Sequence, residues 1–278
     1  MTDTSQQKFF MGKIDYINAS PVYYGLDHGL KPDWLEMIEG PPAVLNKMIK
    51  NNKLEISPVS AAFYGMNHKE LLVLPDLSIS CNGSVLSVIL MSNFSIDHLH
   101  GKNLVLTEDS ATAAALVRLL TSEKGIVPNF SKKRIQTRND IPADADAALI
   151  IGDAALTQPW EKCFKYRMDL GDIWFKERGL PFVFALWVVR RSYALEHPEC
   201  VQKVLELFCA SKKEGYDHLN AIIKSGADKL GLDESMIREY YDLLFCDLDG
   251  KKVEAVKNFF DSLYDLKIFP DRVNLEFF

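Results

Sequence analysis

The feature that most constrains the fold is an alternation of short apolar runs with helix-start signals over the first ninety residues. Apolar runs typical of strands cover residues 10–17, 35–38, 54–57, 71–74 and 84–91. Segments suited to helices lie between them, each opening on Pro or Ser, at residues 21–29, 42–51 and 60–67. Strands and helices that alternate in this way form βαβ units, so we expect an α/β fold with a mostly parallel sheet.

The same alternation returns after a polar segment, SNFSIDHLHGK, at residues 92–102. We expect strands at residues 103–107, 134–137 and 147–151, a return strand at 181–190, and helices at 111–123, from 153 onward and at 171–179. From residue 198 to 269 the pattern is nearly all helical. Its last segment repeats apolar residues at spacings of three and four from Val253 to Leu266, which predicts a helix that docks on another element.

Two α/β blocks followed by a helical segment indicate two lobes. We expect residues 1–92 to form lobe 1, which residues 191–278 complete after the chain returns, and residues 93–190 to form an inserted lobe 2. Two chain crossings of this kind make a hinge, so the sequence predicts a cleft between the lobes.

Charge and hydropathy narrow the class of partner. The net charge of -6, with 32 Lys and Arg scattered among 38 Asp and Glu, argues against nucleic acid. The longest apolar run, FVFALWVV at residues 182–189, is far shorter than the ~20 residues that span a bilayer. The first ten residues, MTDTSQQKFF, lack the apolar stretch of a secretory signal, so we expect a cytoplasmic protein without a membrane partner. Nothing in the pattern indicates an oligomeric state.

Metal and cofactor motifs are missing from the sequence. The five cysteines contain no CxxC pair, and the HxH of His98 and His100 has no acidic or thiolate partner at metal-ligand spacing. The chain also lacks GxGxxG after a strand, GxxxxGK[ST] and GxSxG. We therefore expect neither a metal nor an organic cofactor.

Small polar residues gather where the expected strands end. In open parallel sheets ligands bind beyond the carboxyl ends of strands, so these residues are candidate binding groups. They come from four strand-to-helix junctions: Asn18 and Ser20; Ser57 and Ser60; Thr107, Ser110 and Thr112; Gly152 and Asp153. Residues of these types also cap helices, and capping alone explains most of them equally well. Free N–H groups and hydroxyls at such junctions suit a small anion.

Six segments, taken in order, resemble the chorismate dehydratase family of the futalosine route to menaquinone. They are KIDYINASPVYYGL, GPPAVLNKMIKNNKLEISPVSAAFYG, LPDLSISCNGSVLSVILMS, LTEDSATAAAL, LIIGDAAL and DLGDIWFKERGLPFVFALWVVRR. The resemblance runs over about residues 11–192. It implies a two-lobed fold like that of the type II periplasmic binding proteins, used as an enzyme. The implied reaction removes water from chorismate, the implied substrate, to give 3-[(1-carboxyvinyl)oxy]benzoate.

The resemblance also assigns residues to roles. The asparagine of the family's Tyr-(Leu/Ile)-Asn motif falls on Asn18, and the serine of its Gly-x-Val-x-Ser motif falls on Ser87, which makes these two the candidate catalytic residues. Ser110 and Thr112 match the family's anion-binding loop. The matched motifs contain no evident general base, so the enolpyruvyl carboxylate of the substrate is a candidate base. Two alternatives share the fold: a small-anion solute-binding protein, and 1,4-dihydroxy-6-naphthoate synthase of the same pathway.

Overall fold

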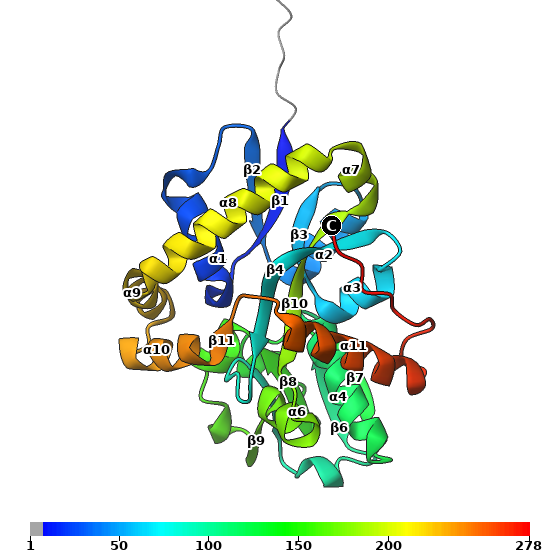
Figure 1. Cartoon of the computed structure of the whole chain (residues 1–278). Coiled ribbons are helices and arrows are strands. Elements are labelled where there is room, and N and C mark those ends of the chain that lie inside the picture. The colour runs from blue at the N-terminus through cyan, green and yellow to red at the C-terminus, as the bar shows by residue number, and fades with distance from the viewer. Residues whose placement is uncertain (1–7) are drawn as a thin grey trace, which may run out of the picture.

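The described part of the chain forms two β-sheets, one in each lobe (Figure 1). The computed structural model describes residues 8–278; most of the N-terminal stretch considered above for a secretory signal, residues 1–7, lies outside this range. The sheet of lobe 1 has the strand order β11-β4-β10-β3-β1-β2. Its strands are β1 (Phe9–Ile14), β2 (Leu35–Gly40), β3 (Ile56–Ser60), β4 (Leu71–Cys81), β10 (Phe182–Arg190) and β11 (Leu244–Phe245).

The sheet of lobe 2 has five strands in the order β7-β6-β8-β5-β9. They are β5 (Val88–Ser92), β6 (Asn103–Thr107), β7 (Asn129–Lys133), β8 (Ala147–Ile151) and β9 (Tyr166–Asp169). Every residue of β5 and β8 is buried, because helices cover both faces of these central strands.

Both sheets are mixed, which corrects the expectation of mostly parallel pairing. Strand β1 pairs in parallel with β2 and β3, and β6 pairs in parallel with β7 and β8. In contrast, β10 runs antiparallel to β3 and β4, and β5 runs antiparallel to β8 and β9. The reason is the crossing of the chain between lobes: β5 and β10 each enter a sheet from its cleft edge, where the neighbouring strands end.

The chain also changes lobes at other positions than the sequence predicts. The first crossing was expected near residue 92 and the second near residue 190. Strand β5 already belongs to the second sheet, and β10 already belongs to the first. The chain therefore changes lobes between β4 and β5, and again between β9 and β10.

Helices cover both sheets. In chain order they are α1 (Ser20–Gly25), α2 (Pro42–Lys50), α3 (Ala61–Asn67), α4 (Ala111–Glu123), α5 (Asp153–Thr157), α6 (Leu170–Arg178), α7 (Arg191–Glu196), α8 (Pro198–Asp217), α9 (Leu219–Leu230), α10 (Glu234–Leu243) and α11 (Gly250–Asp265). No helix within residues 8–278 has the length and apolar character needed to cross a bilayer.

The packing of α8 against α1 fixes the position of the turn after β1 that contains Asn18. Helix α8 crosses α1 at very close range, since a Cβ on Gly215 would lie 2.0 Å from the carbonyl oxygen of Pro21. The hydroxyl of Ser211 donates to the carbonyl of Val22 and accepts the N–H of Leu26. The start of α1, and with it the turn that contains Asn18, is thereby fixed to lobe 1.

Helix α11 confirms the predicted docking helix. Its apolar face, including Val256, Phe259, Phe260 and Leu263, is buried, and the helix packs on β10, α3 and α4. Helix α4 belongs to lobe 2, so α11 contacts both lobes (Figure 1).

Candidate functional site

The cleft between the lobes contains a small cavity where the cleft ends of the two sheets meet. Its volume is about 60 Å³. Its walls are largely apolar, with a few polar groups set among them. The lining residues are Ile14, Tyr16, Asn18, Pro42, Ser60, Ile79, Val85, Ser87, Val88, Asp109, Ser110, Ile151, Gly152, Phe184 and Ala185.

One candidate from each of the four strand-to-helix junctions reaches this cavity. They are Asn18 after β1, Ser60 at the end of β3, Ser110 after β6 and Gly152 after β8. Ser87, which lies between β4 and β5, lines it as well. The strand ends converge because β1, β3, β6 and β8 all point toward the cleft.

Three side chains in the lining carry a buried polar atom that has no hydrogen-bond partner within the described part of the chain. These atoms are the Tyr16 hydroxyl, Asn18 Oδ1 and Ser60 Oγ. A buried polar group left unpaired costs about 1–3 kcal/mol, so folded proteins rarely keep several together. Three such atoms around one cavity point to a ligand that pairs with them.

Helix α3, which follows Ser60, shows how one of these groups is kept free. Ser60 occupies the N-cap of α3 but makes no capping bond. Instead the hydroxyl of Thr112, in lobe 2, accepts the N–H of Ala62 at 2.9 Å. Lobe 2 thus caps a helix of lobe 1, and the Ser60 hydroxyl remains available to the cavity.

The other candidates bind to the protein itself and do not line the cavity. Ser57 is fully buried and donates to the carbonyl of Pro58. Thr107 accepts the N–H of Asp109, which shapes the loop before α4. Ser20 lies in the first turn of α1, where Ala19 and not Ser20 is the N-cap. Thr112 has the capping role described above.

Asp153 joins the two lobes. Its Oδ1 accepts the N–H of Ile17 at 3.3 Å, and its Oδ2 lies 3.7 Å from Nζ of Lys229. Burial raises the pKa of this carboxyl, while the Lys229 ammonium lowers it. Together with Thr112, Asp153 makes the cleft of this structure a closed one.

Gly152 is required at its position by both conformation and space. Its φ of +65° and ψ of -148° lie in a region that is essentially restricted to glycine. A Cβ there would come within 3.0 Å of the Tyr16 ring. Gly152 therefore gives Tyr16 room to lie across the cavity.

Two titratable residues of the cavity lining, Tyr16 and Asp109, were not predicted as site residues from the sequence. Tyr16 stands two positions before Asn18, and burial raises its phenol pKa, so the hydroxyl stays protonated and can donate. Asp109 is only 4% exposed, and burial raises the pKa of its carboxyl against the opposing effect of Arg134. Its Oδ2 accepts from Gln136 and lies 3.4 Å from Nε of Arg134.

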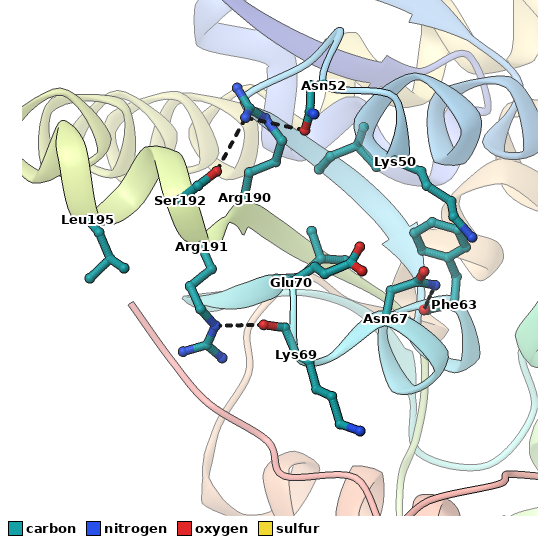
Figure 2. A pocket seen from close by; sticks show the side chains of 12 residues that line it. Lys50, Asn52, Phe63, Asn67, Lys69, Glu70, Arg190, Arg191, Ser192 and Leu195 are labelled. Atoms are coloured by element: carbon teal, nitrogen blue, oxygen red, sulfur yellow. Dashed lines mark hydrogen bonds between the residues drawn. The ribbon is translucent and has the colours of Figure 1, made fainter.

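A larger hollow of about 580 Å³ lies at the end of the lobe 1 sheet away from the cleft, where β4 begins and β10 ends (Figure 2). Both arginines that line it are already paired: Arg190 with Glu55 at 3.1 Å, and Arg191 with Glu276 at 2.9 Å. None of the unpaired buried atoms found for residues 8–278 lines it. The smaller cavity in the cleft is therefore the better candidate site.

The cavity combines two helix starts, which favour a small anion, with one buried carboxyl, Asp109, which opposes it. No Lys, Arg, His or Cys lines the cavity, and residues 8–278 contain no cluster of three or more potential metal-ligating side chains. The starts of α2 and α4 border it through Pro42 and Ser110, and helix starts favour negative charge.

Comparisons with known proteins agree with this architecture. The chain is 28% identical to a chorismate dehydratase of Thermus thermophilus, over 84% of this chain and 86% of that protein. It is 29% identical to a chorismate dehydratase of Campylobacter jejuni, over 89% and 94% respectively.

Solved structures confirm the predicted fold class. A protein of Archaeoglobus fulgidus matches with a TM-score of 0.75 at 17% identity, over 95% of this chain and all of that one. The alkanesulfonate-binding protein of Xanthomonas axonopodis matches with a TM-score of 0.67 at 14% identity, over 96% of both chains. The fold is thus that of the periplasmic binding proteins. The menaquinone biosynthesis family model matches residues 10–265, and the chain belongs to that family.

Proposed function

We propose that this protein is a chorismate dehydratase, a hydro-lyase that forms 3-[(1-carboxyvinyl)oxy]benzoate for menaquinone biosynthesis. The reaction breaks the C3–H and C4–O bonds of chorismate and forms a C3–C4 double bond, and the released proton and hydroxyl leave as water. Family membership and the two dehydratase relatives support this choice. A cytoplasmic location is part of the proposal, and cell fractionation tests it.

The observation that carries the proposal is the set of three unpaired polar atoms inside an apolar cavity. Chorismate offers two carboxylates, a hydroxyl and an ether oxygen on a small ring. The Tyr16 and Ser60 hydroxyls can donate to such oxygens, and Asn18 Oδ1 can accept from the C4 hydroxyl. Ile79, Ile151 and the other apolar lining residues then contact the ring.

The titratable side chains of the cavity favour an elimination in which the substrate supplies the base. Tyr16 and Asp109 are the titratable side chains in the lining. Tyr16 is a poor base because its protonated form is favoured. Asp109 is already engaged by Gln136 and Arg134. The enolpyruvyl carboxylate of chorismate is therefore the proposed base. Asn18 and Ser87 hold this carboxylate and the leaving hydroxyl in reactive geometry, and such positioning can lower the barrier by several kcal/mol.

Substrate entry requires the cleft to open. A cavity of about 60 Å³ is much smaller than the ~300 Å³ or more of typical small-molecule sites. The Thr112–Ala62 and Asp153–Ile17 hydrogen bonds join the lobes and must break as they separate. We propose that closure around chorismate excludes water and aligns Asn18 with Ser87.

The test is incubation of the purified protein with chorismate, without added metal or nucleotide. Loss of the diene absorbance, with a product lighter by one water, is the expected result. Asn18→Ala and Ser87→Ala should each abolish most of this turnover while the proteins remain folded by circular dichroism. Tight binding of chorismate without turnover by the wild type would favour a solute-binding protein instead, and wild-type rates in either variant would contradict its assignment.

A further inference from the structure

The backbone around Ser87 is held in one unusual conformation. Leu86, the preceding residue, has a φ of +61°, which residues other than glycine seldom adopt. The carboxylate of Asp169 accepts the N–H groups of Val85 and Leu86, at 3.0 and 2.7 Å from its Oδ2. The carbonyl of Ser87 accepts the N–H of Gly152 at 2.8 Å. The loop thus presents the Ser87 side chain in a fixed position at the cavity.

A buried phenol then bonds to that side chain from a distant part of the sequence. Tyr240, on α10, is 1% exposed, and its hydroxyl donates to Ser87 Oγ at 2.9 Å. Ser87 Oγ is the hydrogen-bond partner found for this phenol among residues 8–278. Burial raises the phenol pKa, which keeps its proton in place.

The burial of the phenol fixes how this pair shares its protons. Ser87 Oγ is the acceptor found for the buried Tyr240 proton, so donation from Tyr240 satisfies that proton and leaves the Ser87 proton free to point into the cavity that Ser87 borders. We propose that Tyr240 is a positioning residue that makes Ser87 a hydrogen-bond donor to an oxygen of the bound substrate. This inference rests on the proposed dehydratase function and extends it to a residue outside the cavity lining.

The neighbouring tyrosine has a similar place on the other side of the site. The hydroxyl of Tyr241 donates to the carbonyl of Ile17, directly before Asn18, at 2.7 Å. Strand β11 follows α10 without a gap and pairs with the end of β4, which fixes the helix to the edge of the first sheet. Helix α10 thus supports both candidate catalytic residues through adjacent phenols.

The chemistry limits what Tyr240 does. Transfer of its proton through Ser87 to the leaving hydroxyl would leave a buried tyrosinate without a nearby cation, which burial disfavours. Tyr240 therefore orients Ser87 and does not supply the proton of the product water. Loss of the phenol hydroxyl should reduce kcat and have a smaller effect on KM.

The experiment is a double-mutant cycle in the full chain, with Tyr240→Phe, Ser87→Ala and the combined variant. We expect Tyr240→Phe to lower kcat by about 10- to 100-fold, the range seen when the supporting partners of metal-site ligands are removed. The same change in the Ser87→Ala background should have little further effect, because the residue that Tyr240 orients is gone.

Tyr64→Phe is the matched control. Tyr64 is also fully buried, and its hydroxyl donates to the carbonyl of Asn274 at 3.1 Å, away from the cavity. This control should lose stability without a comparable loss of kcat. Wild-type turnover by Tyr240→Phe, or an equal loss in both backgrounds, would overturn the inference while leaving the dehydratase proposal intact. Absence of dehydration by the wild type would overturn the proposed function, and with it the role assigned here.

Discussion

Thr112 offers a direct test of whether a hydroxyl at the cleft binds substrate or holds the lobes together. Its side chain is fully buried and accepts the N–H of Ala62 from the other lobe. Thr112→Val keeps the shape of the side chain and removes the acceptor. The N–H of Ala62 is then buried without a partner, at a cost of about 1–3 kcal/mol.

That cost can be measured without any ligand. For a chain of this size, each kcal/mol shifts the melting temperature by about 2–4 °C, so Thr112→Val should lower Tm by roughly 2–12 °C. Thr112→Ser, which retains the hydroxyl, should stay much closer to the wild type. The assay is thermal unfolding of unliganded protein, followed by chorismate titration of each variant.

The alternative role predicts a different pattern. If Thr112 served only as a substrate ligand, the unliganded Tm of Thr112→Val would equal that of the wild type, and the variant would be weaker only in chorismate binding. That outcome would refute the lobe-to-lobe capping argument. A loss of Tm that Thr112→Ser largely restores would support it.

Three further changes probe the cavity. Asn18→Ala removes a buried acceptor that has no protein partner, so unfolding should show no loss of stability from that atom although turnover falls. Asp109→Asn removes a carboxyl whose pKa burial raises. As pH rises from the pKa of this carboxyl in the unfolded chain through its higher pKa in the folded protein, ionisation destabilises the folded state. The variant should therefore gain Tm at pH 7 and lose that gain in acid. The same change should lower KM, because one negative charge leaves the wall of an anion site. Gly152→Ala should cost about 1–3 kcal/mol of stability from backbone strain and raise KM by displacing Tyr16; an unchanged KM would contradict the place assigned to that ring.

Most of the regular elements could be predicted from local pattern. Strands β6 and β8 and helix α4 have the expected bounds, because each is a central, mostly buried element with a clear apolar run. Strand β7 was expected at residues 134–137 but lies at Asn129–Lys133. Its residues are nearly all exposed at a sheet edge, so main-chain pairing with β6 forms it without an apolar signal. Strand β11 was missed because its two residues, Leu244 and Phe245, are too few to give an alternating pattern after a helix.

The residues of the candidate site also differ in whether local sequence order predicts them. Asn18, Ser60, Ser110 and Gly152 follow from the rule that ligands bind at strand ends, since that rule needs only local order along the chain. The partner of Ser87 could not be inferred in this way. Tyr240 reads as one more buried residue of an amphipathic helix, and the hydrogen bond that gives it a role spans 153 positions.

The bracing of the cleft by α10 has a consequence for how the protein is made. The bond from Tyr241 to Ile17 spans 224 positions, and that from Tyr240 to Ser87 spans 153. A growing chain on the ribosome can therefore fold much of lobe 2 before the support for Asn18 and Ser87 has been synthesised. Contacts this distant in sequence also form slowly after collapse. Activity should thus emerge late in refolding, after most of the helical signal has returned, and a nascent chain that has not yet reached α10 should have none.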